Sequence, residues 1–279
     1  MVKRKGLYQN TPTTQTFLVE GSSTFLGEFL ATQLQWHKPV LEDLSTLVRN
    51  GPPQTLPSEI DAESEDLWAQ TAVLMANYER SGTAQQVAKV VSELPEFPSF
   101  RKMLDLGGGP GLLGIAIVAA HPRMKGVVLD RPAVAKVAEK FIKEYELEDR
   151  MEALGGDYRT DHLGGAYNLI LASATLNFVK DDLDAFLRRV YDALNPGGVF
   201  VAISDGLTDE RTKPELMVTS WLSMGLTGQE MGFEQGFVAD SMLRVGFKSV
   251  RSRTLEMPMG LMDFDVGRKG KKGGGNKNV

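Results

Sequence analysis

Several residue types and patterns are absent or scarce in this chain of 279 residues. It has no cysteine, which excludes disulfide bonds, thiolate metal sites and cysteine nucleophiles. No apolar run reaches the about 18 residues of a membrane-spanning helix, and no apolar segment follows the basic residues 1–5 as it would in a signal peptide. We therefore expect a cytoplasmic protein without a membrane partner.

An excess of positive charge is also missing. The net charge is −5 and the isoelectric point is near 5.4, whereas a nucleic-acid partner or an anionic membrane favours a basic surface. The composition, 42% hydrophobic and 24% charged, is that of an ordinary folded protein. A small-molecule partner, and no nucleic acid, is therefore expected.

The texture of the sequence changes along the chain and predicts three parts. Residues 1–95 read as helical, because apolar residues recur at spacings of three and four, beginning with Phe25, Phe29, Leu30 and Leu34. Residues 96–267 alternate short apolar runs with amphipathic segments, which is typical of a parallel sheet wound with helices. The tail, residues 268–279, is rich in Gly and Lys and is predicted to be disordered.

The middle part predicts five strands followed by a hairpin. The strands are expected at 102–106, 126–129, 151–155, 167–172 and 198–204, and the antiparallel hairpin at 248–255 and 261–266. Helices are expected at 111–120, 132–145, 181–194, 213–225 and 235–244. Ligands of such sheets bind beyond the carboxyl ends of the strands, so the residues that follow each strand are the candidates for a site.

The first strand ends at Asp105 and leads into Gly107, Gly108, Gly109 and Gly111. Glycines permit positive φ and a close approach of the backbone to a ligand, and the next helix offers unpaired N–H groups. A dinucleotide site and a simple tight turn are alternative interpretations of such a loop.

Three further strand ends carry suitable side chains. Asp130 follows the second strand, 19 residues beyond Gly111, where a carboxylate can accept hydrogen bonds from both hydroxyls of a ribose; capping of the helix at Pro132 is the alternative. The third strand is followed by Gly156, Asp157 and Tyr158, which suit the amine and ring of a purine. The fourth leads to Ser173, Asn177 and Phe178, near the expected reacting group.

The loop lacks a phosphate clamp. Leu112 and Leu113 stand where a P-loop has Lys and Ser or Thr, and Leu112 also takes the third glycine position of a dinucleotide fingerprint. An adenosine ligand without a pyrophosphate is therefore favoured.

Short motifs stand in a fixed order along nearly the whole chain: Phe17-Leu18-Val19, Gly21-Ser22, Phe25-Leu26-Gly27, Leu104-Asp105-Leu106-Gly107-Gly108-Gly109-Pro110-Gly111, His121-Pro122, Leu129-Asp130-Arg131-Pro132, Gly156-Asp157 and Ala193-Leu194-Asn195-Pro196-Gly197-Gly198. Together they resemble the plant caffeate-type and bacterial antibiotic O-methyltransferases, a family that includes acetylserotonin methyltransferase. The resemblance implies an α/β fold of the class I methyltransferase (Rossmann-like) type: a seven-stranded, mostly parallel sheet with helices on both faces, preceded by a helical N-terminal segment.

The resemblance also implies S-adenosylmethionine as cofactor and a small-molecule methyl acceptor. Asp130 would bind the ribose, Asp157 the adenine end, and Ser173 would lie near the methionine moiety. The implied cofactor set is Asp105, Gly107, Gly108, Gly109, Gly111, Asp130, Arg131, Gly156, Asp157, Tyr158 and Ser173.

Two departures from the family pattern affect partners and chemistry. The chain starts near the last strand of the family's winged-helix dimerisation domain, at Leu7-Tyr8, so a homodimer and pairing with a separate winged-helix chain both stay open. The family's catalytic His aligns with Asn177, which cannot take up a proton at neutral pH, while Asp205 and Glu230 occupy the places of its carboxylate neighbours.

Methyl transfer can survive this loss, because a general base contributes about 10²- to 10⁴-fold while orienting the reactants contributes roughly 7–11 kcal/mol. The hypothesis is that Asn177 orients an acceptor that is already ionised, or that is a soft or amine nucleophile. The other histidines, His37, His121 and His162, are expected at the surface or in a helix-end turn.

Phe178, Met217, Trp221 and Met224 are candidates for the acceptor pocket, and core packing explains the stripe of Met217, Trp221 and Met224 equally well. Rival functions are non-methylating chemistry with the same cofactor, a non-catalytic binding subunit and a nicotinamide dehydrogenase. No metal site is expected.

Overall fold

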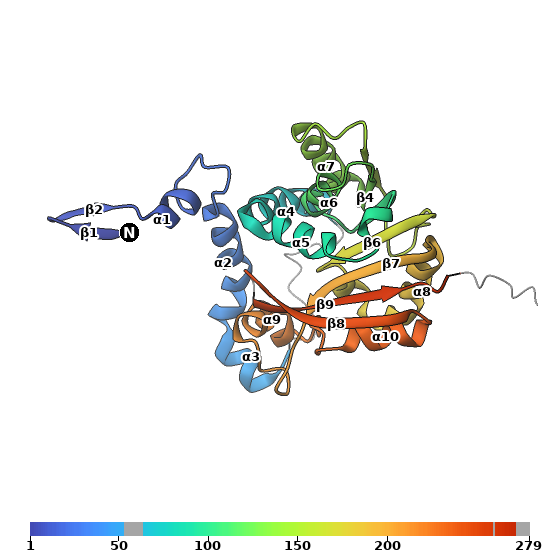
Figure 1. Ribbon diagram of the computed structural model, residues 1–279. Coiled ribbons are helices and arrows are strands. Elements are labelled where there is room, and N and C mark those ends of the chain that lie inside the picture. Colours follow the sequence, from blue (N-terminus) through green and yellow to red (C-terminus); the bar gives the residue numbers. More distant parts are fainter. Residues whose placement is uncertain (53–63, 259, 272–279) are drawn as a thin grey trace, which may run out of the picture.

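A seven-stranded sheet forms the body of the protein in the computed structural model, which describes residues 1–52, 64–258 and 260–271 (Figure 1). Its order is β5-β4-β3-β6-β7-β9-β8, with the first five of these strands parallel and β9 and β8 antiparallel. The strands are β3 (Lys102–Leu106), β4 (Lys125–Asp130), β5 (Met151–Gly155), β6 (Tyr167–Ser173), β7 (Leu194–Asp205), β8 (Lys248–Met257) and β9 (Gly260–Arg268). The predicted class I architecture, including the closing hairpin, is confirmed. The fifth strand begins earlier than expected because Leu194 already pairs with Tyr167.

Helices cover both faces of the sheet, which is why the parallel strands are apolar on both sides. Val128 and Leu171 contribute to a core with α5 (Ala84–Ser92) and α6 (Leu112–Ala119). Leu129 and Ile170 contribute to a second core with α8 (Leu183–Ala193) and α10 (Phe237–Val245). Two further α-helices flank the sheet. α7 (Pro132–Glu144) packs on α4 (Glu65–Tyr78), and α9 (Glu215–Leu226) lies beside β9.

The N-terminal part is helical, as predicted, except for its first residues. Residues 2–9 form an antiparallel hairpin of β1 (Val2–Arg4) and β2 (Leu7–Gln9), whose turn places Lys5 and Gly6 at positive φ. The hairpin and α1 (Pro12–Phe17) project away from the body, and α2 (Gly27–Glu42) and α3 (Leu44–Asn50) continue along its side (Figure 1). The prediction of helix was therefore wrong for the first residues, where strand pairing satisfies the backbone.

The apolar stripe predicted for this part is only half buried. Phe29 stacks on Tyr78 of α4 with ring centroids 5.5 Å apart, whereas Leu30 and Leu34 are 53% and 64% exposed. One side of α2 therefore packs against the body, and the other presents leucines to solvent.

The tail begins later than predicted. Arg268 ends β9, and the ammonium of Lys269 donates to the carbonyl oxygens of Tyr191 and Leu194 at 2.7 and 2.8 Å. These carbonyls lie at the end of α8, where a helix leaves acceptors unpaired and favours positive charge. The start of the predicted disordered tail was wrong for this reason. Residues 272–279 of the predicted tail lie outside the described residues.

Candidate active site at the carboxyl edge of the sheet

The predicted strand ends meet at one edge of the sheet. β3 and β6 are neighbours, and the chain continues from β3 to β4 on one side and from β6 to β7 on the other. The gap between two such strands is the switch point where ligands of these sheets bind. The loop after β3 is tied to both neighbours: Gly109 N donates to Asp130 Oδ2 at 2.8 Å, and Thr175 Oγ1 donates to the carbonyl of Gly107 at 3.1 Å. The Gly156 N–H donates to the carbonyl of Asp130 at 2.9 Å. The structure thus brings together the loop, Asp130, Gly156 and the segment after β6.

Glycine is required in the loop by the backbone and by its neighbours. Gly107, Gly109 and Gly111 have φ of +62°, +54° and +78°, which side chains disfavour. A Cβ on Gly107 would lie 2.5 Å from the side chain of Thr175. A Cβ on Gly108 would lie 2.7 Å from the carboxyl carbon of Asp105. The loop therefore presents bare backbone at the end of β3.

Asp130 is a part-buried carboxylate that holds the loop rather than capping a helix. Its Oδ1 accepts from its neighbour Arg131 N at 2.7 Å, and its other oxygen accepts from Gly109. Burial raises the pKa of Asp130, opposed by these two N–H groups. The start of α7 is capped instead by Glu65 of α4, whose Oε2 accepts from Ala133 N at 2.8 Å. The helix-cap interpretation of Asp130 is therefore wrong.

Two buried carboxylates stand behind the loop at the start of α6. Asp105 is 1% exposed and accepts from Gly114 N at 2.9 Å. Glu79, in the π-helical turn Glu79–Thr83, is 7% exposed, and within the described chain its Oε2 has no hydrogen-bond partner. Burial, and then the charge of Asp105, raises the pKa of Glu79 well above its usual value, opposed by the N–H of Leu112. Sequence reasoning missed Glu79, because nothing in its spacing distinguishes it from a solvated helix residue.

The Asp105 carboxyl makes folding stability dependent on pH. Burial raises its pKa from 3.8 to about 7, so the folded protein holds this proton more tightly than the unfolded chain. This contribution to stability is complete below about pH 4 and is lost as pH rises through about 7. We expect Asp105→Asn to be more stable than the wild type at pH 8 by on the order of 3 kcal/mol. Urea unfolding at pH 5 and pH 8 measures this, and an advantage that does not grow with pH would contradict it.

The ends of β5 and β6 carry the remaining predicted cofactor residues. Asp157 accepts from Arg159 Nε and Nη2 at 2.9 and 2.8 Å, and these bonds lower its pKa, so it is a carboxylate at neutral pH. The half-buried Tyr158 ring packs edge-on to Phe186, and its hydroxyl lies 3.5 Å from the carbonyl of Thr175. Ser173, the last residue of β6, is half-buried at the same edge.

Asn177 is buried in the short helix Leu176–Asp182 that follows β6. Its Nδ2 donates to Asp205 Oδ2 at 2.8 Å and to the carbonyl of Met231 at 3.0 Å. Asp205, at the end of β7, is 4% exposed and also accepts from Phe233 N at 3.3 Å. Burial raises the pKa of Asp205, and the Asn177 bond is the largest of the opposing effects. The predicted pair of Asn177 and Asp205 is thus in contact.

Glu230, the third predicted catalytic residue, is exposed at the surface. Its backbone carbonyl, with that of Gly232, accepts from the ammonium of Lys180 at 2.9 and 2.8 Å. No bond between the Glu230 carboxylate and Asn177 occurs among the described residues. Lys180, which sequence reasoning missed, instead ties the Asn177 helix to the segment around residue 231.

The predicted pocket residues separate into two groups. Met217 is buried in the core, so its part of the stripe is core packing, while Trp221 and Met224 are half-buried. Phe178 is 42% exposed and meets Trp68 of α4 edge-on, with ring centroids 5.4 Å apart. Phe178 and Trp68 therefore form an aromatic wall beside the strand ends.

The histidines serve other contacts. His37 Nδ1 shares a hydrogen bond with Ser223 and so joins α2 to α9, and His121 is buried against Phe97 and accepts from Arg123 N. His162 is exposed and accepts from Gly164 N. His37 is thus less exposed than predicted, because α9 packs against it.

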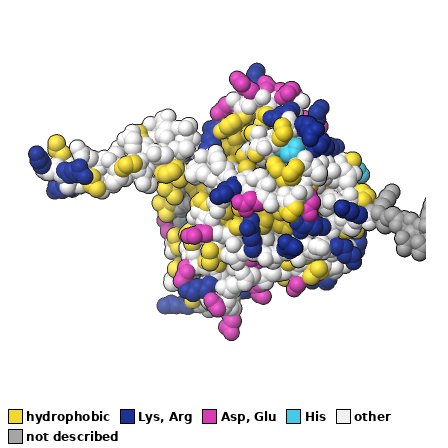
Figure 2. All heavy atoms as spheres, in the orientation of Figure 1, with side chains coloured by type: hydrophobic (Ala, Val, Ile, Leu, Met, Phe, Trp, Pro, Cys, Tyr) yellow, Lys and Arg dark blue, Asp and Glu magenta, His cyan; other side chains and the backbone are white. Residues whose placement is uncertain are grey.

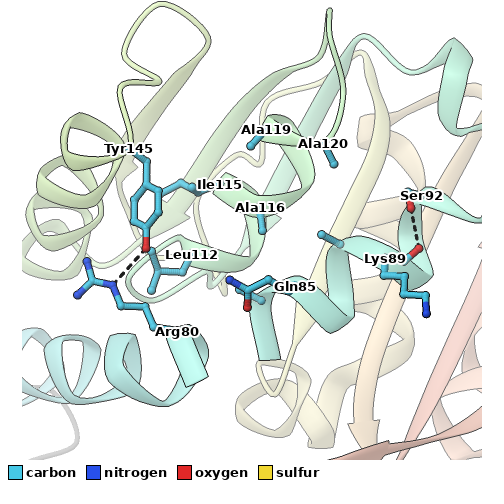
Figure 3. Close-up of a pocket in the computed structure, with 12 residues that line it drawn as sticks. Arg80, Gln85, Lys89, Ser92, Leu112, Ile115, Ala116, Ala119, Ala120 and Tyr145 are labelled. Carbon is cyan, nitrogen blue, oxygen red and sulfur yellow. Dashed lines mark hydrogen bonds between the residues drawn. The ribbon is translucent and has the colours of Figure 1, made fainter. Parts of the chain in front are cut away.

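A hollow of about 500 Å³ lies between α5 and α6 (Figure 3). It is walled by α5 and α6, with Arg80 donating to the Tyr145 hydroxyl at 3.3 Å at one end. Small apolar side chains such as Ala84, Ala88 and Ala116 make up much of its lining. The predicted site residues do not line it, so this hollow is separate from the candidate site.

Other kinds of site find little support in the described ranges. There, no group of three or more His, Cys, Asp or Glu side chains is placed to hold a metal ion. None of the helices there is long and apolar enough to cross a membrane.

The strand order, the glycine loop and the acidic residue at the end of β4 define a Rossmann-like class I methyltransferase fold. The family model of the O-methyltransferase domain matches residues 59–236, well over half of the chain. The chain belongs to this O-methyltransferase family.

Named relatives and solved structures agree with this assignment. The chain is 29% identical to the N,N-dimethyltransferase OxyT of Streptomyces rimosus over 78% of its own length, and 28% identical to acetylserotonin O-methyltransferase of Macaca mulatta over 83%. It spans 64% and 67% of these two relatives, and 58% of the mitomycin biosynthesis 6-O-methyltransferase of Streptomyces lavendulae. The structure of PigF with S-adenosylhomocysteine superimposes with a TM-score of 0.76 at 25% identity, covering 96% of this chain and 80% of PigF. Human N-acetylserotonin methyltransferase with S-adenosylmethionine gives 0.72 at 23% identity, covering 95% and 76%.

Proposed function

We propose that this protein transfers a methyl group from S-adenosylmethionine to a small-molecule acceptor. The observation that carries the proposal is the edge where the glycine loop, Asp130 and the Asn177–Asp205 pair converge. Relatives at similar identity are named for transfer to nitrogen, to oxygen and to carbon, so they leave the acceptor atom open. When bound, the cofactor supplies a methyl group made electrophilic by a sulfonium.

The residues at this edge fit such a cofactor. Asp130 has a second lone pair on each oxygen for the ribose hydroxyls, and Asp157 and Tyr158 would border the adenine. Buried carboxylates are costly unless a proton or a cation accompanies them. Glu79 and Asp105 are two such buried carboxylates beside the loop, and Glu79 Oε2 has no hydrogen-bond partner in the described chain. A ligand that carries positive charge would stabilise them. Gly107, Gly108 and Gly111 would let the ligand approach the backbone, and Arg131 and Gly156 would frame the ribose and adenine.

The chain's own contribution to the reaction is binding, orientation and exclusion of water. Asp130 and the loop would hold the donor with its methyl group near Ser173. The aromatic wall of Phe178 and Trp68 would cover an apolar acceptor, with Trp221 and Met224 further along. Asn177, fixed by Asp205, would orient the acceptor atom. Holding two reactants in line supplies roughly 7–11 kcal/mol, so transfer proceeds without a proton-accepting His.

Incubation with methyl-labelled S-adenosylmethionine and a small-metabolite extract tests this function. Label in a small product supports it. Binding without transfer would favour the rival of non-methylating chemistry or a binding subunit, and absence of binding would contradict the whole proposal. The relatives do not favour these rivals.

We also propose that the N-terminal arm, residues 1–52, is covered by a second copy or by a separate winged-helix chain. Leu7, Tyr8, Leu30 and Leu34 are each more than half exposed on it. Figure 2 shows apolar side chains along the projecting arm and Lys and Arg at its tip. Large apolar side chains exposed in this number on one segment are typical of an interaction surface. A cytoplasmic location stays a prediction.

Charges placed on the exposed face of α2 should disrupt this assembly. We expect Leu30→Lys with Leu34→Lys to shift the sedimentation coefficient to that of the monomer, because two lysines cannot be buried unpaired. Gln35→Lys, on the same helix but outside the leucine pair, is the matched control and should sediment as the wild type does. A wild type that is monomeric at every concentration, with no co-purifying chain, would contradict the proposal.

A further inference from the structure

The orientation of the Asn177 amide is fixed by its two partners. The carbonyl oxygen of Met231 can only accept, so the atom that faces it must be Nδ2 with its hydrogens. The second hydrogen of Nδ2 is donated to Asp205 Oδ2. Reversing the amide would place Oδ1 against two acceptors. Both donors of this side chain are therefore used within the protein.

The atom left for a ligand is the amide oxygen. Within the described residues, no donor reaches Asn177 Oδ1. The bond from Nδ2 to a carboxylate polarises the amide and places more negative charge on this oxygen. Asn177 thus presents an acceptor without basicity, held in place from behind by Asp205 and Met231.

This oxygen distinguishes between nucleophiles. A phenolate, thiolate or carboxylate has no hydrogen to donate and would be repelled by it. A neutral hydroxyl could donate its hydrogen, but it is a poor nucleophile unless the proton is removed, which an amide cannot do. An uncharged amine has both an N–H to donate and a free lone pair to attack.

We propose, on the basis of the methyltransferase function above, that the acceptor is a neutral primary or secondary amine that donates an N–H hydrogen bond to Asn177 Oδ1. The lone pair of the nitrogen forms the bond to the methyl carbon, and the pair of the breaking sulfur–carbon bond returns to sulfur. The nitrogen becomes a methylammonium, whose positive charge strengthens its bond to Oδ1. Its proton then leaves to water, so no protein base is required.

Aromatic amines fit this role well. They are uncharged at neutral pH, whereas an aliphatic amine is protonated and has no lone pair. A flat apolar ring also matches Phe178 and Trp68 beside the site. An aryl amine is therefore the proposed class of acceptor, and the binding site for the methyl donor does not depend on this choice.

The attachment atom of the methyl group is the direct test. The wild-type protein is incubated with carbon-labelled S-adenosylmethionine and a metabolite extract, and the methyl resonance of the labelled product shows whether it is bound to nitrogen, oxygen or sulfur. An N-methyl product is expected. An O-methyl or S-methyl product would overturn the inference and leave the methyltransferase function intact, whereas label transfer to no product would contradict the proposed function itself.

Variants separate the role of Oδ1 from a structural role. Asn177→Leu removes the oxygen and keeps a side chain of similar size. We expect its turnover of the amine substrate that yields the labelled product to fall about 10- to 100-fold, because one hydrogen bond to a charged group contributes a factor of this order. Its affinity for S-adenosylhomocysteine should stay close to wild type, whereas its melting temperature should fall, because the Met231 carbonyl and Asp205 lose their donor. Asn177→Gln, which keeps the amide, should retain more turnover than Asn177→Leu. Equal turnover in all three proteins would overturn the inference.

Discussion

Replacing Asp130 with alanine is expected to lower the affinity for S-adenosylmethionine by about 100-fold or more, because each charge-assisted hydrogen bond to a ribose hydroxyl is worth roughly 1.5–3 kcal/mol. The same change removes the acceptor of the Gly109 N–H and so loosens the loop. Isothermal titration with S-adenosylhomocysteine measures the loss.

Two further variants identify the cause of this effect. Asp130→Asn keeps an oxygen for the Gly109 N–H but removes the charge, and we expect it to bind with an affinity between those of the wild type and Asp130→Ala. Asp149→Ala is the matched control. Asp149 is exposed and precedes the amino end of β5, opposite the candidate site, so this variant should bind as the wild type does. Unchanged affinity in Asp130→Ala would show that the cofactor does not occupy this edge.

Introducing histidine at position 177 is expected to create activity on hydroxyl acceptors. A His there would lie beside Asp205, which could accept from one ring nitrogen while the other takes the acceptor proton. General-base catalysis contributes about 10²- to 10⁴-fold, so O-methylation of a phenol should rise by at least the lower figure. Label transfer to paired aryl amines and phenols of the same scaffold gives the ratio of the two activities.

The gain should depend on Asp205. In the double variant Asn177→His with Asp205→Asn, the carboxylate that fixes the ring tautomer is gone, and most of the gain should disappear. A gain that persists in the double variant would show that the new histidine acts without its predicted partner. No gain in Asn177→His, with the affinity for the donor intact, would contradict the explanation that the base was lost at this position.

Much of this architecture could be predicted because local patterns and global fold agree. The buried strands appear as short apolar runs, and the glycines after Asp105 stand where positive φ is needed. Asp130 ends a strand, and Asp157 and Asn177 each follow one, so the topology of a parallel sheet brings them together. The identity of the cofactor was predicted from the resemblance to the family, because the spacing of the motif residues alone leaves it open.

The rest depends on contacts between segments far apart in the chain. Glu79 and Lys180 look like ordinary helix residues, and only packing places Glu79 behind the loop and Lys180 against the carbonyls of residues 230 and 232. The orientation of the Asn177 amide follows from Met231, 54 residues away. The two strands of the hairpin at residues 2–9 have three residues each, all exposed, so the sequence shows no alternation of apolar and polar residues that would predict them.

The central claim, that this edge holds S-adenosylmethionine, is tested most directly by parallel titrations of the purified protein with S-adenosylhomocysteine and with NAD. The proposed site predicts saturable binding of one S-adenosylhomocysteine per chain, weakened about 100-fold or more in Asp130→Ala, and no saturable binding of NAD. Saturable binding of NAD, with none of S-adenosylhomocysteine, would contradict it and favour a nicotinamide dehydrogenase.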